Sequence, residues 1–182
     1  MPRLRWFLLL PVLLCALLAG CGSAPVVTAV APVAQTASPQ ALAPGDVAVT
    51  GDVATPFTLT PAKLASYPQK TVPATFRSGT ALEAHTFRGA LLSDILPTSA
   101  LAPAPGKNPF LSFAVLGRAT DGYQALVAYG EFAPDFANTQ VLVATVQDGK
   151  PLARPRLVVP GDGRGGRYVT DLVELTVVRV AP

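Results

Sequence analysis

Residues 155–169 read PRLVVPGDGRGGRYV, and this stretch combines an apolar strand with the loop that follows it. Four of the eight residues in 160–167 are glycine, so the backbone can adopt positive φ and bring its N–H groups close to a ligand. Successive N–H groups in such a turn form a concave site for an anion. Arg164 and Arg167 add guanidinium groups that suit phosphate or a planar acceptor edge. The stretch predicts either a ligand-binding loop or a glycine-rich hairpin with solvated arginines.

The segments around this loop have the composition of β-strands. Residues 172–180 alternate between apolar and polar side chains, which indicates a strand with one buried face. Residues 110–116 and 123–129 predict two strands joined through Asp121-Gly122, a strong turn signal. The other predicted strands lie at residues 47–50, 57–59, 70–77, 82–88, 141–146 and 156–159.

Short helices are predicted between these strands. Thr60 is suited to cap a helix and Pro61 to occupy its first position, so residues 62–67 are expected to be helical. Residues 89–96 have apolar side chains at helical spacing, and the next residue is a proline. Residues 131–134 predict a short turn or helical piece. The expected fold class is α+β, a strand-rich mixed-sheet domain with a few short helices.

Histidine and cysteine are too scarce for a clustered metal site. His85 is the single histidine, and the two cysteines are Cys15 and Cys21, close to the N-terminus. A zinc or iron centre built from clustered His and Cys ligands is therefore excluded. The net charge of +3 includes Arg3 and Arg5 of the N-terminal segment, so the rest of the chain is nearly neutral. This charge balance does not favour a nucleic-acid partner.

The N-terminal segment MPRLRWFLLLPVLLCALLAGC has the pattern of an export signal. Its apolar run, residues 7–18, is too short to span a bilayer comfortably and is followed by small residues. Residues 18–21, LAGC, resemble the lipobox of bacterial lipoproteins. That resemblance implies cleavage of residues 1–20 as a signal peptide and lipidation of Cys21, and several acyl chains anchor a protein firmly. The alternative is a plain secretory signal with a cysteine near its cleavage site.

The remaining chain divides into a tether and a domain. Residues 21–44 contain the lipidated cysteine and an uncharged segment rich in Ala and Pro, which is expected to be disordered. Residues 45–182 form the predicted domain. The resulting protein is exported and anchored to a membrane, facing the periplasm from the inner or outer membrane or standing on the cell surface.

Four segments, taken in order, resemble one known family. They are HTFRGALLSDIL (85–96), ATDGYQALVAYGEF (119–132), VLVATVQDGKPL (141–152) and PRLVVPGDGRGGRYV (155–169). Together they resemble the molybdopterin-binding domain of the sulfite-oxidase superfamily in its short bacterial form. The resemblance extends over residues 46–180, and its last segment is the most specific.

The resemblance implies a domain that holds a pterin, or a pyranopterin dithiolene carrying molybdenum, through backbone and basic groups. The expected cofactor-binding residues are Asp121, Tyr123, Arg164, Gly165, Gly166 and Arg167. The Asp121 carboxylate can accept hydrogen bonds from pterin amino groups, and Tyr123 can stack on the ring or donate a hydrogen bond. The alternative for these two residues is a simple hairpin turn. No catalytic residue is predicted.

The sequence departs from the family at two places. The family's enzymes bind the metal through a cysteine that would fall within residues 75–78, where this chain has Thr-Phe-Arg-Ser. Thr170 and Asp171 stand where the family loop continues into a lysine-bearing strand. The sulfur of Cys21 is taken by lipid in this interpretation, so no metal bound by a protein thiolate is expected.

Four further residues have two interpretations each. His85 is either a packed or surface histidine, or a base. Arg77 and Arg88 flank the position of the family's metal-side pocket and bind an anion or remain solvated. Glu131 is a helix cap or a ligand.

Three hypotheses of function follow. The first is a pterin- or molybdopterin-binding module that passes a signal or electrons to a membrane-bound receptor or redox partner. The second is an oxidoreductase that holds molybdenum through the dithiolene alone. The third is a scaffold of the cell envelope that binds no ligand.

Overall fold

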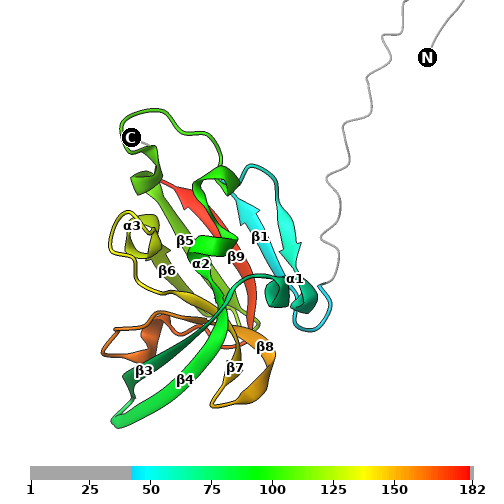
Figure 1. Ribbon diagram of the computed structural model, residues 1–182, viewed down its shortest axis with the longest axis vertical. Coiled ribbons are helices and arrows are strands. Elements are labelled where there is room, and N and C mark those ends of the chain that lie inside the picture. The colour runs from blue at the N-terminus through cyan, green and yellow to red at the C-terminus, as the bar shows by residue number, and fades with distance from the viewer. Residues whose placement is uncertain (1–41, 181–182) are drawn as a thin grey trace, which may run out of the picture. The chain divides into compact units, whose positions relative to one another are not determined.

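The chain forms two β-sheets in the computed structural model, which describes residues 42–180 (Figure 1). The predicted signal peptide, the lipidated Cys21 and most of the predicted tether lie outside the described residues, as do residues 181 and 182. None of the described helices is long and apolar enough to cross a membrane.

The first sheet has five strands in the order β2-β1-β9-β5-β6. Their bounds are β1 Val47–Gly51, β2 Phe57–Leu59, β5 Phe113–Ala119, β6 Gln124–Ala128 and β9 Leu172–Arg179. β1 runs parallel to β9, whereas the other neighbours pair antiparallel. The predicted mixed sheet is therefore confirmed.

The second sheet has four antiparallel strands in the order β3-β4-β7-β8. Their bounds are β3 Gln69–Ser78, β4 Ala81–Leu91, β7 Leu142–Gln147 and β8 Lys150–Val158. β3 contains Pro73, and β8 contains Pro151 and Pro155. Proline has no N–H to donate, and it is tolerated in both strands because they are the two edges of the sheet.

Short helices connect the strands. They are α1 Pro61–Ser66, α2 Leu92–Ile95, α3 Tyr129–Phe132 and the 3-10 turns η1 Thr98–Ala100, η2 Pro109–Ser112 and η3 Gly165–Arg167. The predicted cap of the first helix is confirmed, because Thr60 Oγ1 accepts a hydrogen bond from the Lys63 N–H at 3.1 Å. α3 overlaps the short helical piece predicted at residues 131–134, but it begins two residues earlier, at Tyr129, and ends at Phe132.

The predicted helix over residues 89–96 is wrong for its first half. Gly89, Ala90 and Leu91 continue β4 and pair with β7, and α2 begins only at Leu92. A Cβ atom at residue 89 would lie 2.1 Å from the carbonyl oxygen of Val143, so this glycine lets β7 approach closely. Pairing with a strand more than fifty residues away therefore overrides the local helical spacing of the leucines.

Two further predicted strands begin at residues well away from the expected ones, whereas most other bounds differ by one residue. The strand predicted at 110–116 begins at Phe113, because Pro109–Ser112 form a 3-10 turn that the Ser112 hydroxyl closes onto the Pro109 carbonyl at 2.7 Å. The strand predicted at 156–159 begins already at Lys150, and its pairing with β7 carries it past both prolines.

Apolar side chains form two buried clusters. The larger cluster lies on the five-stranded sheet and includes Leu157 of β8. Leu157 packs against Gly117 of β5, where an added Cβ atom would lie 2.9 Å from the leucine side chain. The smaller cluster covers the inner face of the four-stranded sheet and consists of Val72, Ala74, Phe76, Phe87, Leu142, Ala144, Val158 and Tyr168. Tyr168 follows the glycine-rich loop, so burial of its ring fixes the end of that loop on the sheet.

Candidate functional site

The glycine-rich loop, residues 160–167, connects β8 to β9 and is attached to the end of β3. The Arg77 N–H donates to the Gly163 carbonyl at 3.0 Å, and Arg77 and Arg164 form an isolated parallel bridge. The Tyr168 N–H donates to the Gly165 carbonyl at 3.0 Å and closes η3. The loop is therefore a built structure rather than a solvated hairpin, and it places Arg164 beside Arg77.

Arg167 is held by two carboxylates. Its Nε and Nη2 donate to the two oxygens of Asp162 at 2.8 and 2.7 Å, and its Nη1 donates to Glu131 at 2.7 Å. These hydrogen bonds, first those to Asp162, raise the pKa of Arg167. The other oxygen of Glu131 accepts the Ala128 N–H at 3.0 Å, at the start of α3. Arg167 thus ties the loop to α3, and Glu131 acts as a cap.

The turn between β5 and β6 reaches the same loop. The Tyr123 hydroxyl donates to the Gly166 carbonyl, and the Tyr123 N–H donates to Asp121 Oδ1 at 2.9 Å. The structure therefore brings Tyr123 together with the glycine-rich loop. Asp121 holds its own turn through one carboxylate oxygen. Whether these residues bind a cofactor stays a prediction.

Gly165 has a packing role in addition to its predicted binding role. A Cβ at this residue would lie 2.9 Å from Cδ2 and 3.0 Å from Cε2 of Phe76. The Phe76 ring is 2% exposed and stacks on Tyr168 with ring centroids 4.2 Å apart, so it has little room to move. Glycine is needed here for the loop to lie on the ring. Gly163 has no such neighbour within 4 Å.

A hollow with several arginines lies beside the loop. It has a volume of about 340 Å³ and is lined by Phe76, Arg77, Ser78, Gly79, Glu83, Arg156, Arg164, Gly165 and Gly166. A more open depression of about 610 Å³ adjoins it and shares Arg77, Arg164 and Gly166. We call the two together the basic hollow. Within residues 42–180, the side chains of Arg77 and Arg164 make no hydrogen bond or ion pair. Arg88 is exposed and does not line the basic hollow.

Arg156 is the arginine that sequence reasoning missed. Its guanidinium lies over the rings of Phe87 and Tyr168, 5.5 and 5.9 Å from their centroids. Its Nη1 donates to Gln147 at 3.1 Å, but its Nε and the Tyr168 hydroxyl are buried without a hydrogen-bond partner. Burial lowers the pKa of Arg156, and the nearby Glu83 opposes this effect. A partly desolvated cation with an unused donor favours an anion beside it.

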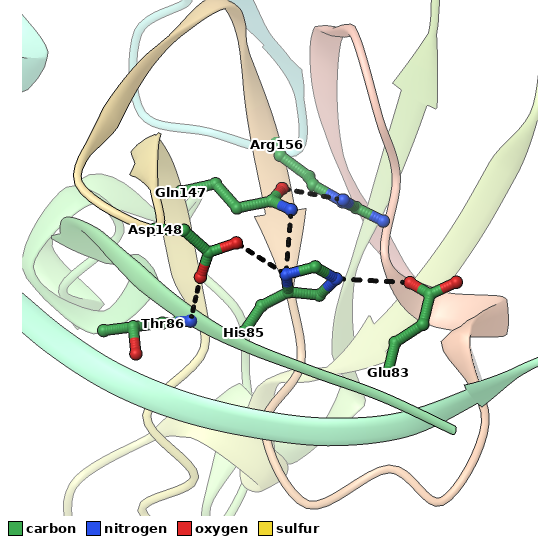
Figure 2. A network of polar contacts seen from close by, with 6 residues as sticks. All are labelled: Glu83, His85, Thr86, Gln147, Asp148 and Arg156. Carbon is green, nitrogen blue, oxygen red and sulfur yellow. Dashed lines mark hydrogen bonds and ion pairs between the residues drawn. The ribbon is translucent and has the colours of Figure 1, made fainter. Parts of the chain in front are cut away.

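A polar network connects Arg156 to the single histidine (Figure 2). His85 Nδ1 lies 2.7 Å from Asp148 Oδ2 and 3.2 Å from the Gln147 amide nitrogen, and its Nε2 lies 3.3 Å from Glu83. The hydrogen bond with Asp148 is the main cause of the raised pKa of His85. His85 is therefore a paired surface histidine, and it holds Glu83 at the rim of the basic hollow.

Asp148 joins this network to the backbone of β4. Its second oxygen accepts the Thr86 N–H at 2.8 Å. This bond is the largest cause of the lowered pKa of Asp148, and the bond to His85 comes next. The network therefore links β4 to the β7–β8 turn.

The donor set of the domain does not form a protein-ligated metal site. No group of three or more His, Cys, Asp or Glu side chains among residues 42–180 is arranged to hold a metal ion. Arg77 and Ser78 occupy the end of β3, where the family's metal-binding cysteine would fall.

The comparison with known proteins identifies the fold. No protein-family model matches the sequence, and no curated protein matches it either. The structure is similar to the sulfane dehydrogenase SoxCD from Paracoccus pantotrophus, with a TM-score of 0.59 and 17% sequence identity. The similarity covers 72% of this chain and 37% of that chain, so this chain spans well under half of the SoxCD chain. The domain therefore has a strand-rich α+β fold that occurs in part of a sulfane dehydrogenase, which confirms the expected fold class.

Proposed function

We propose that this protein is a lipid-anchored, extracytoplasmic module that binds an anionic pterin of the molybdopterin type in the basic hollow. The main observation in its support is that three arginines, Arg77, Arg156 and Arg164, line one hollow. The backbone of Gly165 and Gly166 borders the same hollow. The likeness of the sequence to the sulfite-oxidase superfamily and the fold shared with part of a sulfane dehydrogenase support a ligand of this class. Fold alone does not fix a function, so the proposal depends on the hollow itself.

The residues of the hollow fit the phosphate end of such a ligand. Arg77 and Arg164 offer guanidinium forks at the surface, and Arg156, whose Nε is buried without a partner, adds a third positive charge to the lining. Arginine matches phosphate geometry through two parallel hydrogen bonds. Arg167 contributes indirectly in this proposal, because its bonds to Asp162 and Glu131 hold the loop in place.

The same residues do not fit a metal bound by a protein thiolate. Both cysteines of the chain, Cys15 and Cys21, lie outside the described domain, and the lipid on Cys21 occupies its sulfur in this proposal. A pterin dithiolene supplies its own sulfur ligands to a metal, whereas the chain binds and orients the pterin. We therefore favour binding or signalling over catalysis of the sulfite-oxidase type.

The test uses the full chain, purified from its own host in a mild detergent. Mass spectrometry of the co-purifying small molecules and titration with reduced pterins are expected to show a bound pterin. The double variant Arg77→Ala/Arg164→Ala is expected to weaken binding by about tenfold or more, because each lost charged hydrogen bond removes affinity. Arg88→Ala is the matched control, since Arg88 is an exposed arginine outside the hollow. Absence of binding by any reduced pterin refutes the proposal.

The same preparation decides the other two hypotheses. Molybdenum close to one atom per chain would support an oxidoreductase that holds the metal through the dithiolene alone. If the double arginine variant supports cell-envelope function as well as the wild type, the ligand-free scaffold is favoured instead.

The membrane anchor has a separate test. Cys21→Ser is expected to move the protein from the membrane fraction to the soluble fraction and to remove the mass of the lipid. Cys15→Ser is the control, because Cys15 lies within the segment that cleavage removes. Unchanged fractionation of Cys21→Ser would contradict lipidation and leave pterin binding unaffected.

A further inference from the structure

A second cavity lies apart from the basic hollow and shares no lining residue with it. It has a volume of about 550 Å³ and is lined by Ser93, Pro97, Thr98, Asn108, Phe110, Tyr129, Ala133, Pro134, Asp135 and Phe136. These residues come from α2 and the segment after it, from η2 and its preceding residue, and from α3 with the turn that follows. We call this cavity the aromatic pocket.

Three aromatic side chains form much of its wall. Tyr129 is 4% exposed, and its ring centroid lies 6.0 Å from that of Phe110 at an interplanar angle of 42°. Phe132, which does not line the cavity, packs edge-on against Tyr129 with ring centroids 4.9 Å apart. Phe136, by contrast, is 46% exposed and forms the rim. The pocket thus has fixed rings inside and one open ring at its mouth.

Backbone hydrogen bonds hold the pocket in shape. The Phe136 N–H donates to the Ala133 carbonyl at 3.0 Å, and the Ala137 N–H donates to the Gly130 carbonyl at 3.1 Å. On the opposite wall, the Leu111 N–H donates to the carbonyl of Asn108, which has a left-handed backbone with φ 52°.

The charge of the pocket is negative. Asp135 is the one charged side chain among the lining residues, and no lysine or arginine lines the pocket. Burial and, next, the charge of Asp135 raise the pKa of Tyr129. Two other charged residues are close along the chain but do not line the pocket: Lys107 lines a neighbouring groove, and Asp94, next to Ser93, is half-buried in α2. The pocket therefore combines three aromatic side chains and three neutral polar side chains with one carboxylate.

This combination selects one class of ligand. The faces of aromatic rings attract cations, and several rings together recognise alkylated ammonium groups. An anion would meet Asp135, and a strongly hydrated small cation would lose water to apolar walls. We propose that the aromatic pocket binds an organic cation with an alkylated ammonium head, held by Phe110, Tyr129 and Phe136 and balanced by Asp135. The proposal is independent of pterin binding, because the two cavities have no residue in common.

The test measures binding of two cations to the full chain. The protein is kept in a maltoside detergent, which carries no ammonium group, and is titrated calorimetrically with choline and with tetramethylammonium. Both are expected to bind. The neutral carbon isostere of choline, in which carbon replaces the nitrogen, is expected to bind about tenfold more weakly, because it keeps the shape and loses the charge.

Two surface substitutions locate the site. Asp135→Asn and Phe136→Ala are each expected to weaken cation binding by about tenfold. Both residues are exposed, so the fold is expected to stay intact, as the thermal transition would show. Leu82→Ala, at an exposed leucine on β4, is the matched control and is expected to leave binding unchanged. Equal binding of the isostere, no binding of either cation, or unchanged affinity in both variants would each overturn the proposal.

Discussion

Replacement of Gly165 by alanine tests how the glycine-rich loop lies on the four-stranded sheet. The added Cβ would approach two carbons of the Phe76 ring at 2.9 and 3.0 Å, well inside normal contact. Because Phe76 is buried and stacked on Tyr168, the ring cannot withdraw without disturbing the smaller core cluster. Overpacking of this kind costs about 1–3 kcal/mol, and the lower entropy of the unfolded alanine chain offsets about 0.4–1 kcal/mol of it.

The expected net loss is about 1–2 kcal/mol of the free energy of unfolding. For a domain of this size it corresponds to a melting temperature lower by roughly 3–6 °C. Thermal unfolding followed by circular dichroism measures it. Gly163→Ala is the matched control, because a Cβ there meets nothing within 4 Å and its φ is not positive. That control meets no opposing contact, so it is expected to leave stability unchanged or to raise it by up to about 1 kcal/mol through the same entropy effect.

A second substitution identifies the cause. In a Phe76→Leu background the ring is gone, so Gly165→Ala is expected to cost less than it does in the wild type. A double-mutant cycle isolates this coupling. If Gly165→Ala is no worse than Gly163→Ala, or if its cost is the same in both backgrounds, the packing argument is wrong. A variant of normal stability that lost only ligand binding would assign Gly165 to the ligand instead.

Three further substitutions test the contacts around the loop. Arg167→Met leaves two carboxylates without their partner and is expected to lower the free energy of unfolding by about 2 kcal/mol. The loss should be smaller at high salt, and an equal loss at all salt concentrations would argue against an electrostatic cause. Tyr123→Phe removes one hydrogen bond to Gly166 at a half-exposed residue, so its expected cost in chemical denaturation is below about 1 kcal/mol. His85 has a raised pKa, and its stabilising contribution is therefore present below the unfolded value of about 6.5 and lost as the pH rises through the folded value. The stability difference between the wild type and His85→Gln should accordingly be larger at about pH 6 than at about pH 9, and a constant difference would show that the charge of His85 contributes nothing.

Local signals predicted much of the fold. The Thr60-Pro61 pair predicted a capped helix correctly, because a cap depends on neighbours three residues away. Residues 89–91, by contrast, were assigned to a helix from the spacing of leucines, although they pair with β7. That pairing depends on residues far along the chain, and no local pattern contains it.

The candidate site was predictable only in part, because it also depends on contacts between segments far apart in the sequence. The turn at Asp121-Gly122 and the glycine-rich loop were recognised separately, and the structure joins them through Tyr123 and Gly166. Arg156 lies in the predicted strand 156–159, but its place beside the loop follows from the pairing of β8 with β7, which no local pattern contains. β8 also contains Lys150 and Arg154, so the charge of Arg156 does not by itself distinguish this residue.

The prolines at the edges of the four-stranded sheet limit where two copies of the domain can pair strand to strand. An exposed sheet edge can pair with the same edge of a neighbour, and this is a common first step of aggregation. Pro73 in β3 and Pro151 and Pro155 in β8 interrupt the row of donors on both edges. The five-stranded sheet ends on one side in β2, which has three residues, and on the other in β6, which contains no proline. If two copies of this domain join by adding strand to strand, the junction should form at β6.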